Sequence, residues 1–269
     1  MPLIQELLPK TFVSRGVGLE LGASFRTQED LAACVAAANR YNIPLIAHNY
    51  FYPPGEHFVL NLSDPNPVGM RQSLDYAVDM LDYCAAHNIK AYSIHSGFAC
   101  SFGLGDFGQA ITRLTPEPLD SAYSRFIANV NVLAAHAKTR KVELLLENNV
   151  LTTENLSDGM NLHLLCVDCK AIIHTLKALT HPVRWLLDLG HLKVSAATLG
   201  LSLTEECAAL LPVTGQIHLH DNDGKSDLHL PGSKQAWFWE FLRGRSLSVI
   251  FEQPGTSLAT IFGQISLAK

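Results

Sequence analysis

The chain has 269 residues, of which 48% are hydrophobic and 17% are charged, and its mean hydropathy is +0.13. This composition excludes a disordered or fibrous protein and provides enough apolar material for a large core. The net charge of −5 gives no support for a nucleic-acid partner. No apolar run approaches the roughly 18 residues of a membrane span, and residues 1–10 do not resemble a signal peptide, so we expect no membrane partner.

Short buried strands alternate with amphipathic helices along the whole chain. Each predicted strand is brief and apolar and is followed within a few residues by Gly, Asn, Asp or Pro, as in a buried parallel sheet. Between them, residues 67–87 have an apolar stripe at helical spacing, and Thr27 with Asp30 resembles a capping box that opens another helix. The seven predicted strands are Val17–Leu21, Leu45–Tyr50, Ala91–His95, Val142–Glu147, Trp185–Asp188, Gln216–His220 and Leu247–Glu252.

This alternation predicts a parallel sheet that is either doubly wound or closed into a barrel. Nearly every predicted strand ends in His, Asp or Glu, and a barrel draws its chemistry from many strand ends, whereas a doubly wound sheet uses one switch point. We therefore predict an α/β fold, a TIM-type β/α barrel, in one domain over residues 1–269. With seven recognisable strands the barrel is incomplete at its N-terminus, and we expect its gap to be packed by the apolar residues of 3–8 or by a second subunit of a homo-oligomer.

The six cysteines have no framework spacing, which predicts a reducing, cytoplasmic location. Cys166 and Cys169 form one CxxC pair within residues 161–179, a stretch with a helical pattern. Because no second pair completes a zinc site, we interpret this pair as part of an ordinary helix face.

Nine histidines and carboxylates fall at or after the predicted strand ends. Side chains alternate along a strand, so the terminal polar groups can converge inside one barrel mouth. Gathering them there without a cation would cost several kcal/mol per unpaired charge. Imidazole and carboxylate ligands suit Zn, Mn or Fe, so we predict a cofactor of one to three divalent ions. The predicted ligands are His48, His95, Glu147, Asp188, His191, His218, Asp227, His229 and Glu252.

Five stretches, HNYFYPPGEHFVLNLSDP, SIHSGF, LLENN, LLDLGHL and IHLHDNDGKSDLHLPG, carry a family resemblance. From Val17 onward the chain resembles the xylose isomerase-like barrels, which include endonuclease IV and many sugar isomerases and epimerases. The resemblance implies that a single epimerase metal would be held by Glu147, Asp188, His218 and Glu252. It also implies that the other five predicted ligands correspond to those with which endonuclease IV completes a three-zinc centre.

The sequence departs from endonuclease IV at three places. The opening strand is not recognisable, His220 stands where endonuclease IV has asparagine, and the loop after Glu147 reads NNVLTTEN instead of a Gly-rich continuation. These differences argue against recognition of damaged DNA and leave metal binding intact. The spacing of His220 from His218 places it on the inward face, as an outer partner of a metal ligand or as a proton shuttle.

Two enzymatic functions remain open at this point. The first is an isomerase or epimerase of a small carbohydrate or sugar phosphate, with Glu147, Glu252 and His220 as candidate catalytic residues for proton transfer. The second is hydrolysis of a phosphoester by a metal cluster, which would use all nine ligands. A metal-sensing protein without enzymatic activity is a third, weaker alternative. The loops at the mouth hold few basic residues, which suits one phosphate or a neutral sugar better than a polyanion: Arg26, Arg113, Lys193, Lys225 and Lys234.

Overall fold

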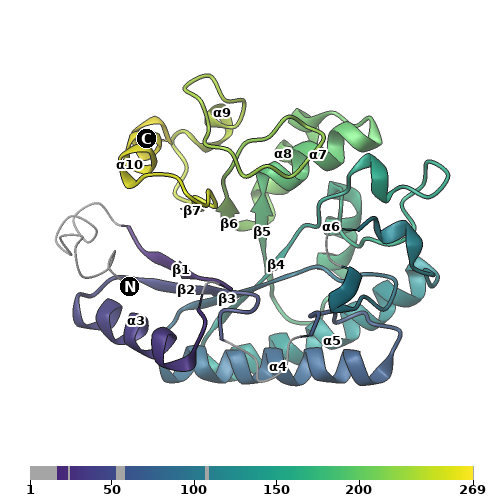
Figure 1. Ribbon diagram of the computed structural model, residues 1–269, viewed down its shortest axis with the longest axis horizontal. Coiled ribbons are helices and arrows are strands. Elements are labelled where there is room, and N and C mark those ends of the chain that lie inside the picture. The colour runs from purple at the N-terminus through teal and green to yellow at the C-terminus, as the bar shows by residue number, and fades with distance from the viewer. Residues whose placement is uncertain (1–16, 24, 53–57, 107–108, 269) are drawn as a thin grey trace.

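The computed structural model describes residues 17–23, 25–52, 58–106 and 109–268. Its strands form one parallel sheet in which each strand pairs with its neighbours in the sequence, in the order β1-β2-β3-β4-β5-β6-β7. Figure 1 shows the sheet curling into a nearly closed barrel with helices on its outside, which confirms the predicted fold class. The strands are β1 (Leu19–Leu21), β2 (Leu45–His48), β3 (Ala91–His95), β4 (Glu143–Glu147), β5 (Arg184–Asp188), β6 (Thr214–His218) and β7 (Ser248–Ile250).

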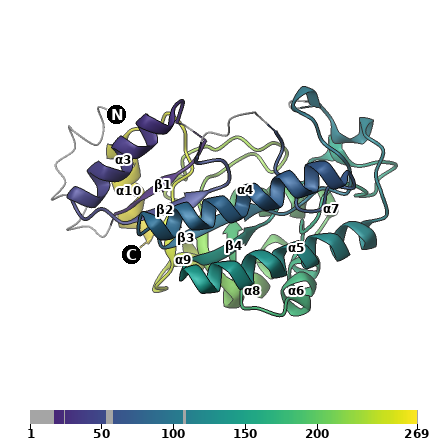
Figure 2. The same ribbon diagram turned by 90° about the horizontal axis from the view of Figure 1, so that it is seen from below.

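Side-chain caps fix where several helices begin. Thr27 accepts a hydrogen bond from the Asp30 amide at 3.1 Å, and Asn66 caps the next helix directly before Pro67. Such a cap contributes about 1 kcal/mol. Figures 1 and 2 show α4 and α5 side by side on the outer face of the strands. The helices are α3 (Gln28–Arg40), α4 (Pro67–Ala86), α5 (Leu119–Arg140), α6 (Cys169–Ala178), α7 (Leu189–Leu199), α8 (Leu203–Leu210), α9 (Trp239–Leu242) and α10 (Leu258–Ala268).

Below its mouth the barrel contains an apolar cluster, with the buried polar residues Ser93 and Gln216 beside it in the strand register. Ala91, Leu145 and Leu186 form a buried cluster between the strands. Because side chains alternate along a strand, Glu147 and Asp188, two residues beyond Leu145 and Leu186, face the same interior at the carboxyl end. Burying each leucine stabilises the folded state by about 1.5–3 kcal/mol, so this layer supports the strand ends that carry the polar mouth. The larger core, between sheet and helices, includes Tyr92, Phe126, Trp185 and Trp239.

Within the described residues, β1 and β7 are the two edges of the sheet. Within the described ranges no ladder joins β7 to β1, so the incomplete barrel predicted from the sequence is confirmed for this part of the chain. Residues 3–8, which we expected to pack the gap, lie outside the described residues, and cover by a second subunit stays a prediction. None of the described helices is long and apolar enough to cross a membrane.

Several sequence-based boundaries are wrong, including the ends of β2 and β7, which stop at His48 and Ile250, so that Glu252 follows its strand instead of ending it. The helix expected over residues 161–179 begins only at Cys169, because Asp168 caps it and Cys166 has a φ of 54°, which no α-helix accommodates. The cysteine pair therefore does not share a helix face. Strand β6 ends at His218, so His220 follows the strand instead of ending it.

Candidate metal centre

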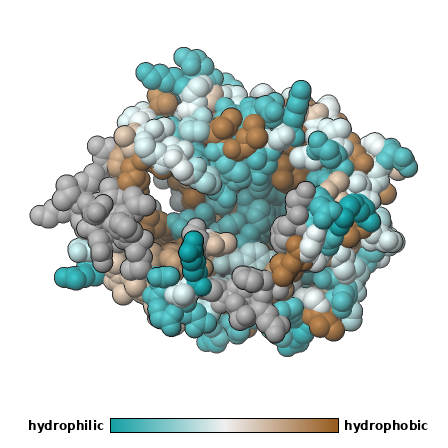
Figure 3. All heavy atoms as spheres, in the orientation of Figure 1, coloured by the Kyte–Doolittle hydropathy of each residue, from teal (hydrophilic) through white to brown (hydrophobic). Residues whose placement is uncertain are grey.

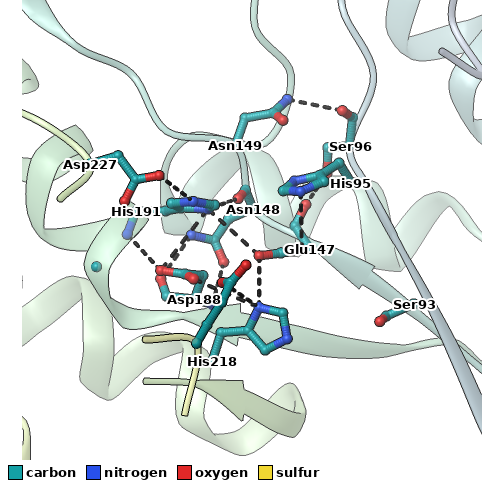
Figure 4. A network of polar contacts seen from close by, with 12 residues as sticks. Ser93, His95, Ser96, Glu147, Asn148, Asn149, Asp188, His191, His218 and Asp227 are labelled. Carbon is teal, nitrogen blue, oxygen red and sulfur yellow. Dashed lines mark hydrogen bonds and ion pairs between the residues drawn. The ribbon is translucent and has the colours of Figure 1, made fainter. Parts of the chain in front are cut away.

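The polar side chains meet at the carboxyl end of the barrel. Glu147, Asp188 and His218 are the last residues of β4, β5 and β6. The strand register places His95 directly beside Glu147, and Asp188 directly beside His218. Figure 4 shows these side chains pointing toward one another from neighbouring strands.

Asp188 also determines where His191 lies. Its Oδ1 accepts a hydrogen bond from the His191 amide at 2.7 Å and caps α7, so the helix begins directly where β5 ends. Asn148 joins this turn to β4: its Oδ1 accepts from the Asp188 amide at 2.9 Å, and its backbone carbonyl accepts from His191 Nδ1, also at 2.9 Å. The sequence LLDLGH thus places a carboxylate and an imidazole in one mouth.

Four overlapping groups of described side chains have the composition of metal sites, and three of them contain the predicted ligands discussed first. In each group, one nitrogen or oxygen per residue lies within 4.8 Å of the others. All nine predicted ligands belong to these groups, and the structure brings them together in one mouth. Group 1 is His48, His95 and Glu147; group 2 is Glu147, Asp188, His218 and Glu252; group 3 is His191, His220, Asp227 and His229.

Glu147 belongs to both group 1 and group 2, and its surroundings show most directly whether these residues could bind a metal ion. Its side chain is 0% exposed, and in the described part of the chain neither of its oxygens accepts a hydrogen bond. Four imidazole nitrogens lie near them: His48 Nε2 at 3.4 Å, His95 Nε2 at 3.6 Å, His191 Nδ1 at 3.7 Å and His218 Nδ1 at 3.2 Å. Ligand atoms on one tetrahedral zinc lie about 3.4 Å apart, given bonds of about 2.0–2.2 Å. The donor set and its spacing therefore fit a bound cation.

The His218 ring is oriented by a residue that the sequence analysis missed. Its Nδ1 faces Glu147 and lies 3.1 Å from Glu252 Oε2, while its Nε2 lies 3.0 Å from Glu20 Oε1 on β1. An outer carboxylate that accepts the other ring N–H fixes the tautomer of a metal-binding histidine and increases its basicity. Glu20 has this position relative to group 2, and with His48 and His218 it forms a further, overlapping group of the same spacing.

We expect Glu20→Ala to weaken metal binding at group 2 by about 10–100-fold, the usual effect of removing an outer partner. Glu20→Gln keeps an oxygen acceptor and should have an intermediate effect. Zinc affinity measured by competition with a chromophoric chelator checks the order. Equal affinities in all three proteins would show that Glu20 does not orient His218; Glu29→Gln, at the start of α3, is the control.

Burial and neighbouring charges determine which side chains of the mouth are protonated at pH 7. Burial lowers the pKa of His48 and of His95 to about 4, so both rings are neutral at pH 7 and have a lone pair for a metal. Burial also opposes ionisation of Glu252, but its contact with His218 outweighs this and lowers the pKa of the Glu252 carboxyl to about 2. Neutral imidazoles and ionised carboxylates are the ligand forms that divalent metals require.

Zinc binding at group 3 should depend strongly on pH. The hydrogen bond to Asp227 raises the pKa of His229 to about 9, even though burial lowers it. Below that pH the metal must displace a proton from His229, and another from His191, whose pKa burial lowers but Asp188 and its neighbouring carboxylates raise well above the ordinary value. Affinity therefore rises with pH, by about tenfold per unit for each displaced proton, until both rings are neutral. Calorimetric titrations in buffers of different ionisation enthalpy would count the released protons. Affinity that does not change between pH about 6 and about 8 would contradict this prediction.

A cavity of about 420 Å³ opens beside the metal groups, a size suited to a small molecule. In Figure 3 this face of the molecule is hollowed near its centre, and hydrophilic residues line much of the hollow. The aromatic rings of Phe98 and Phe102 stack at 5.6 Å on its wall, and His95, His191 and Glu252 also line it. The described lining contains no lysine or arginine.

The basic residues expected near the mouth have other partners or positions. Arg113 pairs with Asp106 at 2.6 Å, and Lys193 pairs with Asp221 at 2.7 Å. None of the five basic residues named from the sequence is among the residues that line the cavity. The cavity therefore offers carboxylates, imidazoles and amides, without the lysine or arginine of a cationic phosphate site.

Comparison with known proteins places these features in a family. The sequence profile of the xylose isomerase-like TIM barrel matches residues 15–245. No curated protein sequence matches the chain.

Three of the similar solved structures show the same fold at low sequence identity. A D-tagatose 3-epimerase-like protein is 13% identical with a TM-score of 0.67, and the alignment covers 92% of this chain and 86% of that one. D-psicose 3-epimerase from Clostridium cellulolyticum H10 is 16% identical with a TM-score of 0.64, covering 97% and 89%. A protein from Thermus thermophilus, soaked with ZnCl2, is 20% identical with a TM-score of 0.64, covering 98% and 93%.

Proposed function

Because the chain belongs to the xylose isomerase-like TIM barrel family, we propose that it is a metal-dependent isomerase or epimerase of a small, uncharged carbohydrate. The observation that carries this proposal is group 2, in which three carboxylates and an imidazole stand within 4.8 Å of one another beside the cavity. The similar solved structures include several sugar epimerases, which supports the same class of reaction.

The residues of group 2 are suited to moving a proton at a sugar carbon. Glu147 and Glu252 approach His218 Nδ1 from β4 and from the segment after β7, at 3.2 and 3.1 Å. Glu252 lines the cavity and is ionised, so we assign to it the removal of the proton. Glu147 stands on the buried side and is the partner that returns the proton. A divalent ion held there would bind adjacent substrate oxygens and stabilise the negative charge that develops as the proton leaves.

The cavity wall favours a neutral sugar over a phosphorylated one. A phosphate group is usually bound by arginine, lysine or a helix N-terminus, and the described lining contains neither basic residue. Asn49, Gln109 and Asn155 place amide groups on the wall, each of which also bonds within the protein. Phe98 with Phe102 offers a flat apolar face for the sugar ring or chain.

The test is solvent-proton exchange into candidate sugars. Protein reconstituted with Zn²⁺, Mn²⁺ or Fe²⁺ is incubated in deuterated water with D-psicose, D-fructose, D-tagatose and their phosphate esters, and carbon-bound deuterium is followed by NMR. We expect exchange at one carbon of an unphosphorylated ketose, and less with its phosphate. Exchange restricted to the phosphorylated sugars would overturn the proposed substrate class, and no exchange in any sugar would overturn the reaction.

Hydrolysis of a phosphoester by a metal cluster is the second candidate. One specific observation favours it: groups 1 and 3 flank group 2, and an enzyme that uses one metal needs neither of them. Closely spaced ions would stabilise the attacking and leaving oxygens together. Hydrolysis of bis(p-nitrophenyl) phosphate by the metal-loaded protein, without deuterium exchange into any sugar, would select this function.

A further inference from the structure

Group 3 contains two histidines whose metal-facing nitrogens are fixed by backbone contacts. His191 Nδ1 bonds the carbonyl of Asn148 at 2.9 Å, and His229 Nδ1 bonds the carbonyl of Glu252 at 3.0 Å. In each neutral ring the proton therefore lies on Nδ1 and the lone pair on Nε2. Both Nε2 atoms face Asp227 Oδ2, at 3.2 and 3.0 Å.

His220 approaches the other oxygen of the same carboxylate. Its Nε2 lies 3.6 Å from Asp227 Oδ1, an oxygen that accepts no hydrogen bond within the described residues. The His220 ring is 0% exposed and stacks on His229 with centroids 4.1 Å apart, so it cannot turn toward solvent. The same Nε2 lies 3.1 Å from Asp188 Oδ2 in group 2.

Room for this ring depends on one glycine. A Cβ built on Gly190 would lie 1.9 Å from His220 Cε1 and within 2.5 Å of both ring nitrogens. Any larger residue at position 190 would displace the imidazole. The absence of a side chain at Gly190 therefore leaves the space that the His220 ring occupies. Endonuclease IV has an asparagine at the position of His220.

We propose that His220 is a fourth protein ligand of group 3, so that one zinc ion is held there by three imidazoles and the Asp227 carboxylate. The inference deepens the proposed function, because it rests on the metal dependence of the same mouth. Four protein ligands fill a tetrahedral shell, which is typical of structural zinc, whereas a catalytic site keeps a position open. Group 3 then holds a permanent ion, and substrate chemistry is confined to groups 1 and 2.

The test compares zinc retention and the cobalt spectrum of the unmodified protein with those of the His220→Asn variant. After dialysis against a chelator we expect the unmodified protein to keep one zinc equivalent and His220→Asn to lose it. The affinity of group 3 should fall by more than the roughly 100-fold that loss of an outer partner costs. With Co²⁺ bound, the intense visible absorption of a four-coordinate ion should weaken in the variant.

Two further variants separate ligation from folding. Gly190→Ala leaves the imidazole in the chain but displaces it, and should lose the same equivalent. His163→Asn changes another buried histidine, whose Nε2 contacts the Leu114 carbonyl, and should keep the ion. Circular dichroism and thermal unfolding check that all variants fold.

The outcomes separate this inference from the proposed function. Unchanged zinc retention and cobalt spectrum in His220→Asn would overturn the ligand role, whatever the sugar assays show. Loss of an equivalent from group 2, with group 3 intact, would also overturn it and make His220 a positioning residue for Asp188. A protein that retains zinc through His220 but exchanges no sugar proton would overturn the proposed reaction alone.

Discussion

Replacing Glu147 with glutamine is expected to lower kcat/KM for the sugar by about 10³-fold or more, within the upper range for loss of a proton-transferring group. The effect is large because one buried carboxylate belongs to both group 1 and group 2. An amide keeps the volume but offers only a neutral oxygen, so both groups lose their shared charge. Metal analysis of the variant should show loss of the ions from groups 1 and 2 and retention at group 3.

Glu143→Gln is the matched control for this variant. Glu143 lies on the same strand and the same face as Glu147, but at the other end of β4, where it is exposed and pairs with Arg184 at 3.4 Å. An exposed pair contributes at most about 1 kcal/mol, so this change should leave activity and stability nearly unaltered. Equal activity of Glu147→Gln and the unmodified protein would exclude Glu147 from the reaction and from metal binding.

Removal of metal is expected to lower the melting temperature by about 10 °C. Five carboxylates face the mouth: Glu20, Glu147, Asp188, Asp227 and Glu252. Among the described residues, their ion-pair partners in the metal-free protein are histidines. An ion at about 1,000 times its dissociation constant stabilises the folded state by about 4 kcal/mol, and each kcal/mol shifts the melting temperature of a chain this size by roughly 2–4 °C.

Scanning calorimetry of the protein with and without a chelator, at one protein concentration, measures this shift. Adding Zn²⁺ should restore the higher melting temperature. Ca²⁺, which prefers shells made only of oxygen, should not. An unchanged transition after complete chelation would mean that the mouth binds no ion in the folded protein.

The fold and the mouth were predictable from sequence because both depend on local patterns. A single polar residue at the end of a buried apolar strand, such as Glu147 after LLL or Asp188 after WLL, is often a structural group, but barrels place catalytic residues at several strand ends. Repeating this signal strand after strand identified the nine residues that the structure brings together. Their roles as metal ligands remain a prediction for the experiments above.

The features that were missed depend on contacts between distant residues. Glu20 lies in a three-residue strand, LEL, and its partner His218 is 198 residues away, so no spacing indicates the contact. Gly190 lies in the stretch LLDLGHL, and the sequence does not indicate that its missing side chain makes room for the His220 ring. The misplaced start of α6 has a local cause: the apolar periodicity continues past Asp168, although that residue is the helix cap.

The contact between Glu20 and His218 has a mechanical consequence for the open side of the barrel. Strand β1 has one paired neighbour, β2, and its other side faces the seam where the described sheet ends. Across that seam the Glu20 carboxylate contacts the His218 ring on β6. This side-chain contact joins the two sides of the seam, whereas backbone hydrogen bonds join the other neighbouring strands. Opening of the seam and release of the His218 ring are therefore one event. The amide protons of β1 and β7 should therefore exchange with solvent more slowly when metal ions occupy the mouth. Hydrogen exchange at the open side of the barrel would then report the metal occupancy of the centre.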